Sequence, residues 1–347
     1  MDRFDTSVSL LISATVGAGV FALPILAKTV GLSSVFIILA AFAYMLGLGY
    51  LIIGMFPGSV EDEVERHLGE RARAAIILVE YAIVFLALTA YLVGLKSHLG
   101  VSNILMFIVV AIPLIMQLHF PASFTNILAF FILAFVSSLT LIAIPGMELP
   151  AKFIDVATLI TPTGMQAAVF LFLASSFAFY GHNMIPRVRN IIRNKKTTER
   201  VFYTAISIVF LLYLPFSVAV SGLGADDMAT SFLVRVLSEP WSALTNLLAV
   251  IIFYTSFVLF GLKVLDDIGN TGESITLVIV GTAVLYYMTQ LASIPFHLIV
   301  SAAGLGVSIY AFLVSLSAVR AKKHIPVAYS NLVFTTLLWI SLILQFF

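Results

Sequence analysis

Two short stretches of this sequence decide the fold. They read Ser13-Ala14-Thr15-Val16-Gly17-Ala18-Gly19-Val20-Phe21-Ala22-Leu23-Pro24 and Ser175-Ser176-Phe177-Ala178-Phe179-Tyr180-Gly181-His182-Asn183-Met184-Ile185-Pro186. Each lies inside an apolar run long enough to cross a membrane as a helix. Paired glycines, or Gly-His-Asn in a row, favour a break at this depth, and a break leaves backbone groups without partners. We expect both helices to unwind here and to present N–H and C=O groups to a substrate. The alternative is that Gly17 and Gly19 only permit close helix packing.

Composition supports a membrane protein and excludes several other classes. Of the 347 residues, 61% are hydrophobic and 10% are charged, and the mean hydropathy is +1.12. Soluble domains have roughly 45–50% apolar and about 25% charged residues. The net charge of +1 argues against nucleic acid as a partner. The chain has no cysteine, and no two of its six histidines have a ligand spacing on one helix. We therefore expect no resident metal, no cofactor and no enzymatic activity.

The apolar runs predict an all-α polytopic protein with about eleven transmembrane helices. A span needs about 20 apolar residues. The predicted spans are 7–28, 31–54, 73–95, 101–118, 123–144, 163–186, 201–222, 243–265, 275–292, 296–318 and 328–346. They leave no loop long enough for a soluble domain, so residues 1–347 are expected to form one transmembrane domain embedded in a lipid bilayer. The first run lacks a basic start and a cleavage site, and we expect it to be retained.

Basic residues predict the orientation of the spans. With the N-terminus in the cytoplasm, fourteen of the 18 Lys and Arg residues lie inside. The four that lie outside are Lys28, Lys96, Lys152 and Arg235. This bias predicts a cytoplasmic N-terminus and an external C-terminus, in a chain placed in the cell membrane.

The positions of the two interrupted helices indicate an inverted repeat. The first break follows about ten residues after its span enters from inside, and the other follows about thirteen residues after its span enters from outside. Broken helices at corresponding positions of two inverted halves are typical of a transporter binding site. We expect residues 7–144 and 163–318 to form the two five-helix repeats, with 328–346 as an extra helix.

The two stretches also resemble a known family. Residues 15–24 resemble the first-helix motif of the amino acid/auxin permease family, and residues 177–186 resemble its sixth-helix motif. The resemblance implies a LeuT-like five-plus-five fold of the amino acid–polyamine–organocation superfamily. It also implies alternating-access transport of amino acids, driven by protons or sodium, with aromatic or hydrophobic substrates favoured.

The residues around the breaks form the predicted substrate site. The start of the outer half of the first helix suits a carboxylate, because its free N–H groups and dipole face the break. The carbonyl groups that end each first half-helix suit an ammonium group. The candidate substrate-binding residues are Thr15, Gly17, Ala18, Gly19, Phe21, Ser176, Phe177, Ala178, Phe179 and Gly181.

Two sets of residues are candidates for ion coupling. Glu80 lies about 10 Å into its span at 1.5 Å per residue, and it either carries a proton or forms a salt bridge. His182 either carries a proton or caps a half-helix, and Asn183 is expected to be structural. Thr255 and Ser256 resemble the hydroxyl pair of sodium-coupled relatives, completed here by carbonyls near Ser13 and Val16. The alternative for Thr255 and Ser256 is back-bonding within their helix.

Other functions fit the sequence less well. A channel would need a filter-like ring, and an enzyme would need a nucleophile–base pair or a metal cluster. A non-transporting amino-acid sensor or a passive exchanger on the same fold remains the alternative to a secondary amino-acid transporter. The identity of the amino acid and the oligomeric state are not encoded in any local motif.

Overall fold

The computed structural model describes residues 3–55, 59–116, 122–146, 161–269 and 271–344, and every regular element within these ranges is a helix. The elements of the first half are α1 (Arg3–Thr15), α2 (Ala18–Val30), η1 (Gly31–Ser33), α3 (Ser34–Met55), α4 (Val60–Leu68), α5 (Glu70–Leu99), α6 (Asn103–Ile115), α7 (Ala122–Ala143) and η2 (Ile144–Gly146). Those of the second half are α9 (Pro162–Ala178), η3 (His182–Met184), α10 (Ile185–Ile192), α11 (Lys195–Gly222), α12 (Ala229–Val236), α13 (Trp241–Ile268), α14 (Gly272–Leu291), α15 (Phe296–Arg320) and α16 (Ile325–Ile343).

Helices occupy the predicted apolar ranges. Within the described residues, nine helical segments are long and apolar enough to cross a membrane. One of them, Ala18–Gly54, runs through two of the predicted spans, and α6 has only 13 residues, or about 20 Å at 1.5 Å per residue. Lys152, residues 117–118 at the end of the fourth predicted span and residues 345–346 at the end of the last lie outside the described residues. The chain is therefore a polytopic helical membrane protein.

Local sequence explains where several helices begin and end. Ser102 starts α6 by accepting a hydrogen bond from the N–H of Leu105 (3.3 Å), and Asn194 starts α11 by accepting one from Thr197 (3.1 Å). Thr161 caps α9 in the same way, with a proline following it at the first helical position. Gly100 ends α5 in the left-handed conformation, which glycine adopts without steric cost.

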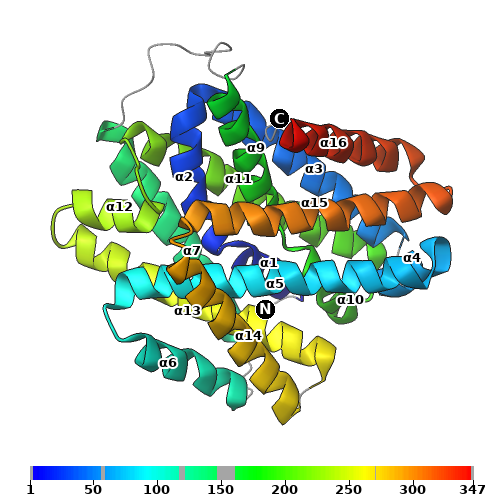
Figure 1. Cartoon of the computed structure of the whole chain (residues 1–347), viewed down its shortest axis with the longest axis horizontal. Helices are drawn as coiled ribbons and strands as arrows, with labels where there is room; N and C mark the ends of the chain where they lie inside the picture. Colours follow the sequence, from blue (N-terminus) through cyan, green and yellow to red (C-terminus); the bar gives the residue numbers. More distant parts are fainter. Residues whose placement is uncertain (1–2, 56–58, 117–121, 147–160, 270, 345–347) are drawn as a thin grey trace.

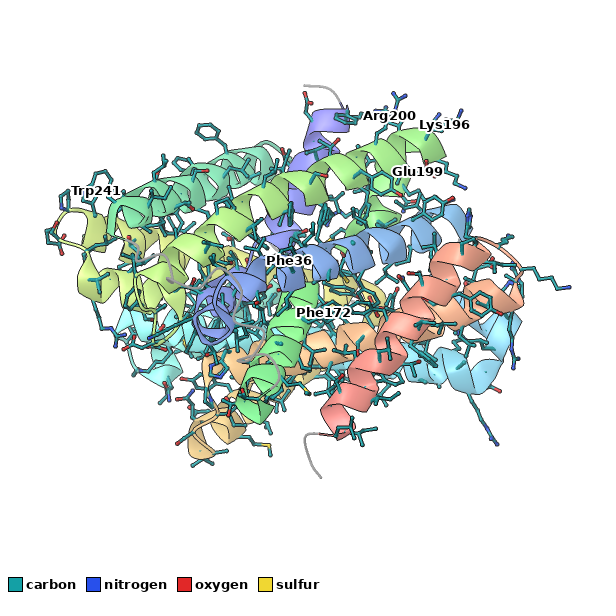
Figure 2. The ribbon with its side chains drawn as sticks, turned by 90° about the horizontal axis from the view of Figure 1, so that it is seen from above. Phe36, Phe172, Lys196, Glu199, Arg200 and Trp241 are labelled. Atoms are coloured by element: carbon teal, nitrogen blue, oxygen red, sulfur yellow. The ribbon has the colours of Figure 1, made fainter. Side chains whose placement is uncertain are left out.

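The long helices pack side by side, and charged residues gather at one end of the molecule. α15 packs against α5, α9 and α16, and Figure 1 shows α5 and α15 crossing the molecule together in opposite directions. Lys196, Glu199 and Arg200 lie together at one end of α11, whereas Trp241 lies at the far end of the molecule (Figure 2). We call the end that carries α4, α10 and the start of α11 the basic end.

The far end is closed by a short helix. α12 packs against α13 and α2 and is tied to α5 through His98, whose ring nitrogens bond Asn246 Oδ1 (2.8 Å) and Thr230 Oγ1 (2.9 Å). Lys28 at the end of α2 donates to the carbonyl of Gly224, which precedes α12 (3.0 Å). These bonds hold α2, α5, α12 and α13 together at the end of the molecule opposite the basic end.

Candidate functional site

The first predicted break is present between α1 and α2. α1 ends at Thr15 and α2 begins at Ala18, and the backbone of Gly17 between them is extended. The break frees the last carbonyl groups of α1, and side chains from other helices bind two of them. The Tyr213 hydroxyl of α11 donates to the Thr15 carbonyl (3.0 Å), and the Ser256 hydroxyl of α13 donates to the Val16 carbonyl (3.4 Å). α11 and α13 therefore satisfy the freed backbone that a regular helix would have paired.

The second predicted break is present between α9 and α10. The backbone turns twice after Ala178, with Tyr180 N donating to Phe177 O (2.9 Å) and Gly181 N donating to Phe179 O (3.0 Å). The turn η3 then leads into α10. The local turns satisfy these backbone groups without help from neighbouring helices.

His182 has a defined proton position in this break. Its Nε2 lies 2.9 Å from the carbonyl of Met45 in α3, and a carbonyl only accepts, so Nε2 carries the proton. In the neutral ring Nδ1 is then an acceptor. Nδ1 is buried and has no hydrogen-bond partner within the described residues, and the same holds for both amide atoms of Asn183. The expected structural role of Asn183 is therefore supported by no side-chain hydrogen bond within the described residues.

The two breaks lie against each other. A Cβ atom built on Gly19 would lie 2.5 Å from the Cα of Ala178, and one built on Gly181 would meet the hydroxyl of Thr15. A Cβ on Gly17 would lie 2.7 Å from the Tyr91 hydroxyl. The structure thus brings together four of the predicted substrate-binding residues, Thr15, Gly19, Ala178 and Gly181. The first helix is interrupted, as predicted, and its glycines also permit close packing. The presentation of its backbone groups to a substrate stays a prediction.

The remaining predicted substrate residues are packed beside the breaks. The Phe21 ring lies 5.3 Å from that of Phe253, and the Phe179 ring lies 5.5 Å from that of Tyr213, measured between centroids. The Ser176 hydroxyl bonds back to a carbonyl of its own helix (2.9 Å). Ala18 and Phe177 are buried as well. The aromatic rings therefore form an apolar wall around the point where the breaks meet.

The residues predicted to bind sodium divide into two groups. Ser256 reaches the Val16 carbonyl, as the prediction requires, and Ser13 is buried in α1. Thr255 instead bonds back to the carbonyl of Ile251 in its own helix (2.7 Å), which is the alternative interpretation.

A cavity of about 1090 Å³ opens on the second break from the basic end. Residues 182–184 line it together with side chains of α4, α5, α10, α13 and α15. Glu80 also lines it and forms an ion pair with Lys263 of α13 (3.1 Å), with each side chain 14% exposed. Glu80 therefore forms the salt bridge that was the alternative to a proton carrier. We call this space the basic-end cavity.

Charge in the basic-end cavity favours anions. Its basic lining residues are Arg187, Arg189, Arg193, Lys195 and Lys263. Its acidic lining residues are Glu61, Glu80 and Asp266. Five basic against three acidic side chains leave a formal charge of +2, and a cleft with one excess sign attracts the opposite charge.

Three residues of the site escape sequence reasoning. Lys263 enters the sequence analysis only in the count of basic residues on the inside, but it lies in α13 and pairs with Glu80. Tyr213 reaches the first break from 198 residues away, which no local pattern reveals. Arg187 belongs to a basic segment that predicts topology, and its place beside Asn183 in a cavity depends on the break itself.

Comparisons with known proteins show the fold only. No family model matches the sequence, and no curated protein matches it. Solved structures of a manganese transporter from Eremococcus coleocola are similar over nearly the whole chain. A complex with an aromatic bis-isothiourea substituted compound has a TM-score of 0.60 at 12% identity and covers 99% of this chain and 86% of that one. Two mutants have TM-scores of 0.58 and 0.59 at 14% identity, covering 97% and 99% of this chain and 85% and 86% of theirs.

These findings overturn the family that the motifs indicate. The prediction of an amino acid/auxin permease with a LeuT-like fold is wrong, because the similar structures are manganese transporters and no family model supports the resemblance. The physical reason lies in the motifs. Small residues at a break are required wherever two interrupted helices pack closely, so they report the break rather than ancestry. What the likeness shows is a shared fold over nearly the whole chain.

Proposed function

We propose that this protein is a secondary active transporter that moves an amino acid across the membrane by alternating access, coupled to a proton or sodium gradient. The observation that carries the proposal is the contact between the two interrupted helices at Gly19 and Ala178, deep among buried residues. Irregular backbone at membrane depth is tolerated where it lines a site. The basic-end cavity, which reaches residues 182–184 of the second break, supports one of the two openings that alternating access needs.

The chemistry around the first break suits a carboxylate. α2 begins at Ala18, has 13 residues and carries no acidic residue in its first turn. Its first amide groups have no capping side chain, because Gly17 precedes them. The start of such a helix binds anions through these N–H groups and the helix dipole. The apolar wall that includes Phe21 and Phe179 supports a substrate with a hydrophobic or aromatic side chain.

Contacts between helices support the inverted repeat as part of the proposal. α1 packs against α11 and α7, and α9 packs against α3 and α15. If residues 7–144 and 163–318 are equivalent halves, α11 corresponds to α3 and α15 corresponds to α7. The contacts of α1 with α11 and α7 in one half then correspond to the contacts of α9 with α3 and α15 in the other. The proposal places the N-terminus and the basic end on the cytoplasmic side of the cell membrane, with α16 as the extra helix.

The coupling ion has two candidate sites. The bond from Ser256 to the Val16 carbonyl supports a sodium site at the first break, because hard cations bind such oxygen atoms. His182 and Glu80 are the candidates for proton coupling, although the pairing of Glu80 with Lys263 supports a structural role for that carboxylate. Gradient experiments separate the two ions.

A divalent metal ion is the second candidate substrate, since the similar structures are manganese transporters. The donor set does not favour it. Within the described residues there is no group of three or more His, Cys, Asp or Glu side chains that could hold a metal ion. Residues 15–21 and 176–181 also contain no carboxylate, the ligand that hard divalent cations prefer.

Uptake into proteoliposomes tests the proposal. The panel is labelled phenylalanine, leucine, alanine, glutamate and lysine, with Mn²⁺ in a parallel set, each under an imposed sodium or proton gradient. We expect saturable accumulation of a neutral amino acid that stops when the gradient collapses. Accumulation under sodium alone would assign coupling to Ser256 and Val16. Uptake of Mn²⁺ without any amino acid would overturn the proposal in favour of the second candidate.

A further inference from the structure

The basic-end cavity contains buried polar groups to which the proposed function assigns no contact with the substrate. Asn183 is 8% exposed and His182 is 2% exposed, and both line the cavity. The Asn183 amide and His182 Nδ1 have no hydrogen-bond partner within the described residues. Buried polar groups in native proteins nearly always have partners, because an unmade hydrogen bond costs free energy. Three unsatisfied atoms on two neighbouring residues therefore indicate a ligand that completes them.

We propose that His182, Asn183 and Arg187 form a second binding station for the transported amino acid at the floor of the basic-end cavity. This inference rests on the proposed function. An amino acid has a carboxylate that accepts hydrogen bonds and an ammonium group that donates them. The Asn183 amide nitrogen and the Arg187 guanidinium bind the carboxylate, while His182 Nδ1 and the Asn183 amide oxygen accept from the ammonium group.

The fold positions His182, Asn183 and Arg187 to bind an amino acid. The bond from His182 Nε2 to Met45 O fixes the ring and keeps Nδ1 an acceptor. Asn183 lies in the turn η3 and Arg187 lies in the first turn of α10, and both residues line the same cavity. The Arg187 side chain lines the same cavity and has no ion pair within the described part of the chain.

The charge of the cavity selects the same kind of ligand. The formal charge of +2 on its lining attracts a carboxylate and repels a free cation. The ion pair of Glu80 with Lys263 adds no excess charge of its own. The carboxylate of a zwitterion is attracted by the excess of basic side chains, and its ammonium group donates to His182 Nδ1 and the Asn183 amide oxygen. A metal ion would interact favourably only with these two acceptor atoms.

The second binding station lies on one side of the transport site. The test therefore compares how each substitution changes the half-saturation concentration when substrate is supplied from each face of the membrane. Sealed membrane vesicles of both orientations are loaded with labelled L-phenylalanine, or with whichever amino acid of the panel is taken up best. The chain has no cysteine, so Lys196→Cys at the basic end reports through an impermeant thiol reagent which face is outside. The variants Asn183→Leu and Arg187→Gln are compared with the control Arg200→Gln, an exposed basic residue of α11 that does not line the cavity.

We expect both variants to raise the half-saturation concentration about tenfold when substrate arrives at the basic end, since each loses a charge-assisted hydrogen bond. The half-saturation concentration for substrate that arrives at the opposite face stays within about twofold of wild type. The control Arg200→Gln stays within the same limit from either face. Asn183→Leu also keeps or raises the melting temperature, because it removes atoms that had no partner and replaces them with apolar ones of similar size.

Several results would overturn the proposal. Equal changes of the half-saturation concentration from both faces would place Asn183 and Arg187 in the central site. An unchanged half-saturation concentration from the basic end would show that these residues bind no substrate. A fall in the melting temperature of Asn183→Leu would show that the amide is structural. A wild-type protein that transports amino acids with none of the expected sidedness contradicts this inference alone, whereas a wild type that takes up no amino acid contradicts the proposed function as well.

Discussion

The two interrupted helices solve one physical problem in different ways. At the first break, between α1 and α2, hydroxyl groups from α11 and α13 bind the freed carbonyls of Thr15 and Val16. At the second break, between α9 and α10, local turns satisfy the backbone, but polar atoms of His182 and Asn183 remain without partners and line a cavity. Two freed carbonyls of the first break are bonded by other helices, whereas buried polar side-chain atoms at the second break have no partner within the described residues.

This difference indicates what has to change during transport. The basic-end cavity reaches residues 182–184, so under the proposed alternating access the opposite opening requires the elements at the far end, tied through His98 and Lys28, to separate. The first break would then exchange its bonds from Tyr213 and Ser256 for bonds to substrate or ion. Substitutions at the two breaks therefore affect stability and transport to different extents.

The largest effect is expected where the breaks touch. Gly19→Val places a side chain against the backbone of Ala178, which a Cβ would approach to 2.5 Å. Overpacking against backbone is expected to cost about 3 kcal/mol and to abolish transport. Thermal unfolding in detergent and proteoliposome uptake measure the two losses. The control Gly272→Ala, at the start of α14 with nothing within 4 Å, should change stability by less than about 0.5 kcal/mol. Normal unfolding of Gly19→Val would show that the breaks are not in contact.

Removing the hydroxyl groups that close the first break should have the next largest effect. Tyr213→Phe leaves the Thr15 carbonyl buried without its partner, and the expected loss is about 1–3 kcal/mol in the free energy of unfolding. Tyr329→Phe is the matched control, because that tyrosine is 53% exposed. Chemical denaturation of both variants checks the difference. If the two variants are equally stable, the first break is not closed by Tyr213 and the contrast between the breaks is lost.

The ion pair beside the second break should contribute less. Glu80 and Lys263 are each 14% exposed, so their pairing lies between the surface case and the fully buried case. A double-mutant cycle with Glu80→Gln and Lys263→Met should give a coupling energy of about 1 kcal/mol. Uptake driven by a proton gradient should survive Glu80→Gln if the pair is structural. Loss of proton-driven uptake with unchanged stability would instead make Glu80 the proton carrier.

The helices and their breaks could be predicted from the sequence because they depend on local composition. Apolar runs of membrane length give helices, and the glycines near residues 17–19 and 181 mark where two of them stop. The contact of Ser256 with Val16 is expected only through the resemblance of Thr255 and Ser256 to the hydroxyl pair of sodium-coupled relatives. The helices and their breaks need no knowledge of which helix lies beside which, whereas the contact of Ser256 with Val16 does.

Features that depend on tertiary packing could not be predicted. The residues that line the basic-end cavity with Asn183 and Lys263 come from helices remote in sequence. The sequence alone therefore does not reveal the roles of Asn183 and Lys263 in this cavity. The family assignment failed for a related reason. The motif around Gly17 and Gly19 records the steric demand of a close helix crossing, and unrelated sequences meet the same demand with the same small residues.

The smallest effect should separate the two adjacent hydroxyls of α13. The Thr255 hydroxyl already bonds the carbonyl of Ile251 in its own helix (2.7 Å), so Thr255→Val removes no bond that the first break needs. We expect a change in stability within about 0.5 kcal/mol and an unaltered sodium half-saturation in uptake. Ser256→Ala, one residue away, removes the bond to Val16 O and should raise the sodium requirement if that carbonyl binds the ion. A sodium requirement raised equally by both variants would show that the break rearranges to engage Thr255, and it would make the closed first break a property of one transport state only.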